Sequence, residues 1–212
     1  MGLGDLARLN NAERLEYYKT HGFNGATDNA LAHNLERVRW LKGEHAAKPF
    51  FKFLDLGCHD GFITRWMLDS FSFGCLVGID PNEQAIRAAE LMLASTTAPE
   101  KGVYINSGFE TVKLVTLFDG VSSTEMIEHF TQEEGEGIIK YMWDHLAPEG
   151  RGFICTPNID GRWGRTNPDE HHINLFGMAH LLGTVQKVTG ADPVPCGYKN
   201  ECDFLNVRFI KP

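Results

Sequence analysis

The chain has 212 residues, of which 42% are hydrophobic and 23% charged, so we expect one folded domain with a full core rather than a disordered or fibrous chain. The formal net charge of −8 is the wrong sign for a protein that gains affinity by neutralising phosphates, so nucleic acid is a disfavoured partner. The 5 cysteines include no CxxC pair, which argues against a disulfide framework and against a thiolate zinc site.

No leader pattern and no run of about 18 apolar residues is found, so we expect a soluble, cytoplasmic protein without membrane contact. We interpret the entire chain as one domain. Residues 1–48 are predicted to form a helical flank or lid, with helices at 11–19 and 28–42 on either side of a glycine-bearing turn. Residues 49–212 are predicted to form the core. The oligomeric state is left open.

Strands and helices alternate through the core, and this alternation predicts a mostly parallel sheet. The predicted strands are 50–56, 75–80, 102–106, 117–123, 152–156 and a last strand that ends at Ile210. The predicted helices are one that carries Phe62 to Met67, then 82–94, 132–145 and 175–189. The longest stretch without a regular period is 157–174, and loops of that length are commonly functional.

A glycine-bearing turn, Asp55-Leu56-Gly57-Cys58-His59-Asp60-Gly61, lies where the first core strand becomes a helix. Glycine is needed at such a turn because a side chain would keep the backbone away from a ligand. Asp80 ends the next strand, where an acidic residue typically takes ribose hydroxyls. The GxGxxG spacing of a dinucleotide-binding loop is absent, which disfavours that alternative.

This turn, together with Val77-Gly78-Ile79-Asp80, resembles the first two motifs of class I methyltransferases that use S-adenosylmethionine. The resemblance implies a Rossmann-like, doubly wound, mostly parallel α/β sheet of seven strands with helices on both faces. It implies that Asp55 orients the methionine end of the cofactor, that the loop from Gly57 to Gly61 packs against it, and that Asp80 holds the ribose diol. His59 stands where this family usually has a glycine.

A third motif, Ser107-Gly108-Phe109-Glu110, follows the third strand, where the resemblance implies contact with the adenine. Phe109 is expected either to stack on the base or to be an ordinary core aromatic. The cofactor-binding residues that we predict are Asp55, Gly57, Cys58, His59, Gly61, Asp80, Pro81, Gly108, Phe109 and Glu125.

Two further segments, Glu125-Met126-Ile127-Glu128-His129 and Cys155-Thr156-Pro157-Asn158, follow the fourth and fifth strands. They resemble segments of the O-methyltransferases of ubiquinone biosynthesis and of the enzymes that methylate the 2′-hydroxyl at small-RNA 3′ ends. The second resemblance implies a divalent metal, Mg²⁺ or Mn²⁺, held by Glu125, Glu128, His129 and His171. Two carboxylates with two imidazoles suit such ions. Whether His171 or His172 faces the site is left open.

His129 is also a candidate general base for removing a hydroxyl proton during methyl transfer, with Glu128 orienting it. A third possibility is that Glu128 and His129 only hydrogen-bond the backbone. Methyl transfer itself needs little covalent help, because the sulfonium is already activated and in-line positioning supplies much of the rate.

These features predict an S-adenosylmethionine-dependent methyltransferase that O-methylates a small-molecule acceptor. The alternatives are a metal-assisted 2′-O-methyltransferase of RNA ends, which the acidic charge opposes, and a non-catalytic subunit that keeps the methyltransferase fold and serves a partner protein. Salt-dependent RNA binding would separate the first two.

Overall fold

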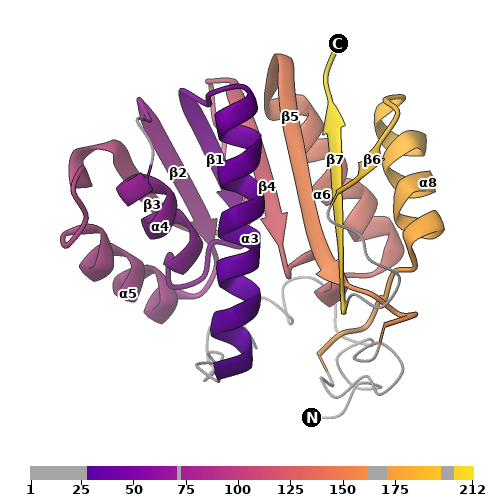
Figure 1. The fold of residues 1–212 in the computed structure, drawn as a ribbon, viewed down its shortest axis with the longest axis horizontal. Coiled ribbons are helices and arrows are strands. Elements are labelled where there is room, and N and C mark those ends of the chain that lie inside the picture. Colours follow the sequence, from indigo (N-terminus) through magenta and orange to yellow (C-terminus); the bar gives the residue numbers. More distant parts are fainter. Residues whose placement is uncertain (1–27, 71–72, 162–170, 197–202) are drawn as a thin grey trace. The chain divides into compact units, whose positions relative to one another are not determined.

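The computed structural model describes residues 28–70, 73–161, 171–196 and 203–212 (Figure 1). Its helices are α3 (Asp28–Ala47), α4 (Phe62–Ser70), α5 (Glu83–Leu93), α6 (Gln132–His145) and α8 (Met178–Thr189). Its strands are β1 (Lys52–Leu56), β2 (Cys75–Asp80), β3 (Gly102–Asn106), β4 (Phe118–Thr124), β5 (Leu146–Pro157), β6 (Val194–Pro195) and β7 (Phe204–Ile210). The helix predicted at 11–19 lies outside the described residues.

The strands follow the order β3-β2-β1-β4-β5-β7-β6. The pairs β1–β2, β2–β3 and β4–β5 are parallel, whereas β7 runs antiparallel to both β5 and β6. The prediction of a Rossmann-like, mostly parallel, seven-stranded sheet is thereby confirmed. The described residues divide into two compact units, with the boundary along the chain between Val115 and Thr116. The single-domain organisation stays a prediction.

The core of the N-terminal unit is built on two strands, β1 and β2, that are buried on both faces. Phe53, Leu54 and Leu56 of β1 are all fully buried, and β2 is buried from Leu76 to Asp80, which explains the continuous apolar runs of the sequence. Helices α4 and α5 pack against β2. Helix α5 begins where Asn82 accepts hydrogen bonds from the main-chain N–H groups of Gln84 and Ala85. This cap fixes the start of the helix immediately after β2.

The C-terminal unit is built on β4, β5 and β7, with α6 packed against β4, β5 and α8. A capping box between Thr131 and Glu134 starts α6 at the predicted residue, and Gly190, with φ of 71°, ends α8. Along β7 the residues Leu205, Val207 and Phe209 are fully buried and alternate with more exposed ones. This period of two is typical of an antiparallel strand.

Several elements differ from the prediction, among them α3, which ends at Ala47 rather than at residue 42. Strand β5 begins at Leu146 rather than Gly152, because Leu146 is fully buried and pairs with Phe118 of β4 before the register shifts. Helix α8 begins at Met178, three residues later than predicted, because Phe176 forms an isolated bridge with Asn158. The two-residue strand β6 was not predicted, since it has too few residues to show a period.

Among the described residues, none of the helices combines the length and the apolar character that crossing a membrane requires.

Candidate functional site

The loop after β1 turns sharply through three residues with left-handed backbone angles. Gly57, His59 and Gly61 have φ values of 72°, 47° and 73°. The main-chain N–H groups of Gly57 and Cys58 donate to the carbonyl oxygen of Ile79 at 2.9 and 3.2 Å, which ties the loop to β2. The loop is therefore held as a defined turn at the carboxyl ends of two parallel strands, where open α/β sheets bind ligands.

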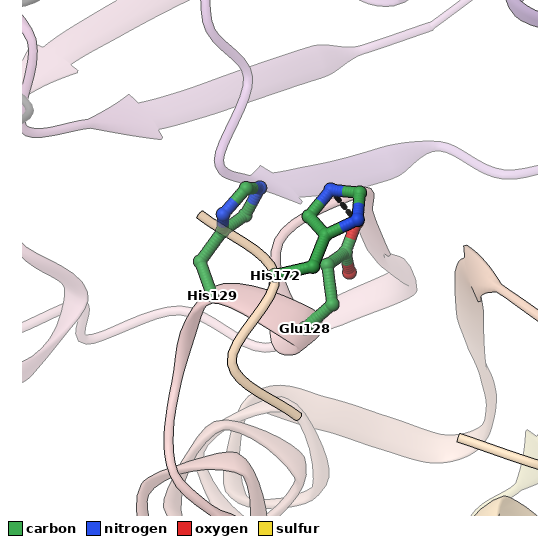
Figure 2. A group of neighbouring side chains, drawn as sticks. All are labelled: Glu128, His129 and His172. Carbon is green, nitrogen blue, oxygen red and sulfur yellow. Dashed lines mark ion pairs between the residues drawn. The ribbon is translucent and has the colours of Figure 1, made fainter. Parts of the chain in front are cut away.

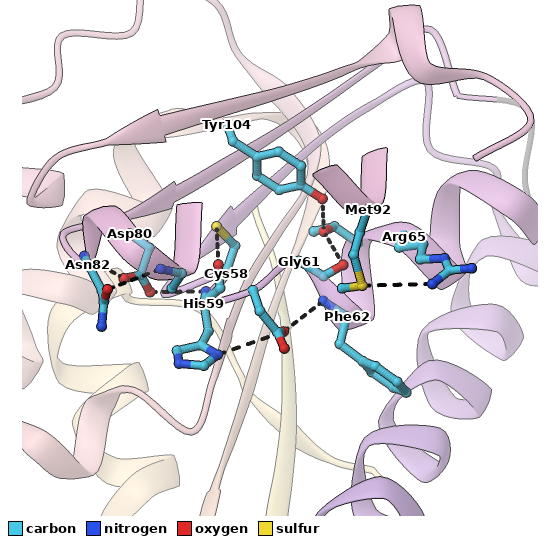
Figure 3. A network of polar contacts seen from close by, with 12 residues as sticks. Cys58, His59, Gly61, Phe62, Arg65, Asp80, Asn82, Met92 and Tyr104 are labelled. Carbon is cyan, nitrogen blue, oxygen red and sulfur yellow. Dashed lines mark hydrogen bonds and ion pairs between the residues drawn. The ribbon is translucent and has the colours of Figure 1, made fainter. Parts of the chain in front are cut away.

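The Asp80 carboxylate joins this loop to the start of α5 (Figure 3). Its Oδ2 accepts a hydrogen bond from the main-chain N–H of His59 at 3.0 Å, and its Oδ1 accepts one from Asn82 at 2.8 Å. The side chain is nearly buried, and this burial raises the pKa of Asp80, while the two N–H donors act in the opposite direction. A carboxylate has about four lone-pair sites, so Asp80 can still accept from a ligand.

Two buried hydroxyl groups, those of Thr64 and Tyr104, stabilise the same loop on its core side. Thr64 of α4 donates to the carbonyl oxygen of Gly61 at 2.9 Å and hydrogen-bonds the hydroxyl of Tyr104 on β3. A Cβ at Gly61 would lie 2.6 Å from that Tyr104 hydroxyl and 2.9 Å from Cβ of Ala89. Glycine is therefore required at position 61 both by its backbone angle and by the lack of space.

Cys58 turns its side chain into the core, where it packs with Ile86, Ala89 and Tyr104. Burial, reinforced by the nearby carboxylates of Asp80 and Asp55, raises the pKa of the Cys58 thiol well above its usual range. The thiol is protonated near neutral pH and is no nucleophile. Only the backbone of Cys58 is placed to contact a ligand in the loop.

The remaining predicted cofactor residues of this unit lie on connections tied to β2. The main-chain N–H of Ser107 donates to the carbonyl oxygen of Asp80 at 3.0 Å, and the Asn106 side chain donates to that of Pro81 at 3.0 Å. Gly108 then precedes a short 3-10 turn, Phe109–Thr111, in which Phe109 is partly buried. Asp55, at the end of β1, is 1% exposed. The partial burial of the Phe109 side chain leaves both interpretations of Phe109 open.

A second group of predicted residues follows β4 in the C-terminal unit. Glu125 has φ of 50°, its main-chain N–H donates to the carbonyl oxygen of Cys155 at 2.8 Å, and its side chain is exposed. A short 3-10 turn, Ile127–His129, comes next and places Glu128 at 0% exposure. A fully buried carboxylate is costly unless other groups compensate its charge.

Glu128, His129 and His172 form what we call the carboxylate–histidine cluster (Figure 2). One potential ligand atom from each of the three residues lies within 4.8 Å of the other two. His172 Nε2 is 4.0 Å from Glu128 Oε1, and the hydroxyl of Thr156 donates to Glu128 Oε2 at 2.9 Å. The rings of His129 and His172 meet edge to face, with centroids 5.0 Å apart.

The segment that carries His171 and His172 is fastened to the 3-10 turn by its backbone. The N–H groups of Ile173 and Asn174 donate to the carbonyl oxygen of Glu128 at 2.9 and 3.1 Å. The carbonyl oxygen of His171 faces Nδ1 of His129 at 3.2 Å. His172 thus contributes its ring to the cluster, whereas His171 contributes a main-chain acceptor.

The predicted set of Glu125, Glu128, His129 and His171 is therefore brought together only in part. Glu128 and His129 lie in the cluster, but Glu125 and the ring of His171 are not among its members. The sequence analysis placed His171 in the set and left open which histidine faces the site, whereas the structure brings the ring of His172 into the cluster. Thr156 was not predicted as a site residue, although it belongs to the segment Cys155-Thr156-Pro157-Asn158, most of which the structure places at the end of β5.

The contact between His129 and His171 also fixes the protonation pattern of the His129 ring. A carbonyl oxygen only accepts hydrogen bonds, so Nδ1 of His129 must carry the proton in this contact. In the neutral ring, Nε2 is then the unprotonated nitrogen, which acts as an acceptor. His129 can accordingly accept a proton or bind a metal ion through Nε2.

A family profile described as a methyltransferase domain matches residues 53–150. The match covers both the loop after β1 and the segment from Glu125 to His129. In a comparison with curated protein sequences, none matches the chain.

Solved structures share the fold at low sequence identity. The methyltransferase domain of bacterial CtHen1 is 18% identical, with a TM-score of 0.70. The match covers 84% of this chain and 98% of that chain. The N-methyltransferase NodS from Bradyrhizobium japonicum is 19% identical, with a TM-score of 0.65 and coverages of 87% and 98%. Magnesium protoporphyrin IX methyltransferase (ChlM) from Synechocystis, with bound S-adenosylhomocysteine, is 11% identical, with a TM-score of 0.75 and coverages of 96% and 100%.

Proposed function

We propose that the chain is an S-adenosylmethionine-dependent methyltransferase and that it methylates an oxygen atom of a small-molecule acceptor, which the methyltransferase-domain match and the class I fold support. Nucleic acid is a poor candidate acceptor, because the net charge of −8 opposes phosphate binding. The choice of oxygen as the methylated atom is supported by His129, whose Nε2 can accept a proton and which lies beside the buried carboxylate of Glu128.

The residues of the loop after β1 fit the cofactor in charge and hydrogen-bonding capacity. S-adenosylmethionine presents a ribose diol that donates hydrogen bonds and a sulfonium that is positively charged. Asp80 would accept from the diol, and Asp55 would orient the methionine end. When bound, the cofactor supplies an activated methyl group.

In the proposed reaction, the acceptor oxygen forms a bond to the methyl carbon while the bond from sulfur to that carbon breaks. The products are a methyl ether and S-adenosylhomocysteine, and the hydroxyl proton passes to Nε2 of His129. The neighbouring Glu128 carboxylate stabilises positive charge on the histidines of the cluster. A positioned base of this kind contributes about 10²- to 10⁴-fold to a proton-transfer step.

His129→Asn is expected to lower kcat by about 10²-fold while leaving the affinity for S-adenosylhomocysteine unchanged. The asparagine amide can still donate to the carbonyl oxygen of His171, but it has no equivalent of the accepting Nε2. Turnover is measured with isotopically labelled S-adenosylmethionine over panels of hydroxyl and amine acceptors. Methylation of amines alone, or unchanged kcat in His129→Asn with a hydroxyl acceptor, would contradict the proposal.

The composition of the cluster favours a second candidate, a metal-assisted methylation of a 2′-hydroxyl at an RNA end. One carboxylate and two imidazoles make a suitable donor set for a divalent transition metal, and a proton on Nδ1 of His129 makes Nε2 the nitrogen that would coordinate. Glu128, His129 and His172 would hold the ion, which would lower the pKa of the acceptor hydroxyl.

If this second candidate is right, chelator-treated protein binds Mn²⁺ in calorimetric titration, and Glu128→Gln lowers the affinity for Mn²⁺ at least about tenfold. Gln132→Ala serves as the control, because this residue starts α6 outside the cluster. Equal Mn²⁺ binding by the wild type and Glu128→Gln would remove the cluster as the metal site. Salt-dependent binding of a short RNA would further separate the two candidates.

A further inference from the structure

The loop after β1 carries several acidic side chains and a single side chain that can become a cation. Asp60 belongs to the loop, Asp55 is the residue before the last one of β1, and Asp80 joins the loop through the main-chain N–H of His59. Within residues 55–61, His59 is the only residue whose side chain can carry positive charge. The charge of the loop therefore depends on the protonation state of His59.

His59 occupies a backbone position that suits glycine better. Its φ of 47° lies in the left-handed region, which side chains other than those of asparagine, aspartate and histidine seldom adopt. The imidazole is not packed into the core, because 43% of the side chain is exposed. Backbone strain of this kind persists where the surroundings impose it, and it clusters at ligand-binding sites.

The groups that surround the imidazole favour its protonated form. Nδ1 of His59 is 3.7 Å from Oδ1 of Asp60, which also accepts a hydrogen bond from the main-chain N–H of Phe62. The close contact with Asp60 raises the pKa of His59, and Asp80 adds to this, while burial opposes it. The same contact holds the pKa of Asp60 below its usual range. The Cys58 thiol, which donates to the His59 carbonyl oxygen, is neutral.

Asp60 faces one of the two ring nitrogens of His59, which leaves Nε2 as a second donor. S-adenosylmethionine offers one anionic group, the carboxylate of its methionine end, alongside a cationic sulfonium and a cationic ammonium. Asp55, Asp60 and Asp80 complement the cations, and within residues 55–61 His59 is the residue whose side chain complements the anion. We propose that His59 binds the carboxylate of the cofactor through Nε2, with Asp60 as the residue that positions the ring. This inference rests on the proposed function, because it requires the cofactor to occupy this loop.

The direct test is calorimetric titration with S-adenosylhomocysteine at about pH 6 and about pH 8, the range in which histidine titrates. A protonated His59 attracts the carboxylate, so affinity is full below the pKa of His59 and falls as the pH rises through it. We expect the wild type to bind about three- to tenfold more tightly at the lower pH, a modest factor because the side chain is half exposed. His59→Gln should show no such pH dependence and should bind as the wild type does at the higher pH.

Two controls separate the carboxylate contact from effects on the fold. Decarboxylated S-adenosylhomocysteine should bind the wild type with little pH dependence, because it lacks the group that His59 recognises. His59→Gly should match the weak, pH-independent binding of His59→Gln without a lower thermal midpoint, since glycine tolerates the left-handed backbone. Pronounced pH dependence in His59→Gln, or equal pH dependence with the decarboxylated ligand, would overturn this inference alone. Failure of the wild type to bind S-adenosylhomocysteine at either pH would instead overturn the proposed function.

Discussion

Asp80→Ala is expected to weaken the binding of S-adenosylhomocysteine by about ten- to a hundredfold, the loss that corresponds to one charge-assisted hydrogen bond to the ribose. The buried carboxylate also accepts hydrogen bonds from the main-chain N–H groups of His59 and Asn82. Its removal therefore weakens the anchoring of the loop as well as the contact with the ligand. Both effects act in the same direction. Calorimetric titration of the variant measures them together.

Glu83→Ala is a matched control for the loss of charge. Glu83 is exposed, lies three residues from Asp80 and pairs only at the surface with Arg87. Exposed ion pairs contribute little, so this variant should bind S-adenosylhomocysteine as the wild type does. Near-normal affinity in Asp80→Ala would show that the end of β2 does not hold the ribose.

Gly61→Ala is expected to lower the free energy of unfolding by about 3 kcal/mol, the sum of a left-handed backbone penalty and of overpacking. The added Cβ would meet the Tyr104 hydroxyl and the side chain of Ala89, both inside the core of the N-terminal unit. Since the loop would have to shift to relieve the clash, cofactor affinity should fall as well. Denaturant unfolding measures the first effect, and calorimetry the second.

Gly43→Ala tests the same substitution at a position where neither the backbone angle nor a lack of space disfavours alanine. Gly43 is exposed on α3, and a Cβ there would have nothing within 4 Å. This change should stabilise the protein by about 0.5 to 1 kcal/mol, because alanine is the better helix former. If Gly61→Ala were as stable as Gly43→Ala, the proposed packing behind the loop would be wrong.

The elements that could be predicted best from the sequence are those with local signals. The Thr131 capping box marks the start of α6, and Asn82 marks the start of α5. The glycine turn and Asp80 are also local signals, because the turn directly follows a buried strand and Asp80 is the last residue of the next one. The start of β5 was misplaced because the pairing of Leu146 with Phe118 is a long-range contact that leaves no local mark.

The choice between His171 and His172 could not be made from the sequence for a similar reason. Two adjacent residues in an irregular segment have no period that assigns one of them to the site. The choice depends on how Ile173 and Asn174 bond to the carbonyl oxygen of Glu128, a contact between distant parts of the chain. The departure of His59 from the family glycine was visible in the sequence, but its contacts with Asp60 and Asp80 required the structure.

Strained backbone marks both predicted site segments. Among the described residues, the non-glycine residues with positive φ are His59, Glu125 and Glu149. His59 lies three residues after the end of β1, and Glu125 directly follows β4. Holding such residues in the left-handed region costs about 1 kcal/mol or more each. That both lie in segments predicted for cofactor binding agrees with a functional reason for the strain.

The most direct test of the central claim is calorimetric titration of the wild-type protein with S-adenosylhomocysteine at about pH 6.5. We predict binding at one site per chain with a dissociation constant on the order of micromolar. The absence of measurable binding would contradict the claim and would leave a methyltransferase fold that does not hold its cofactor.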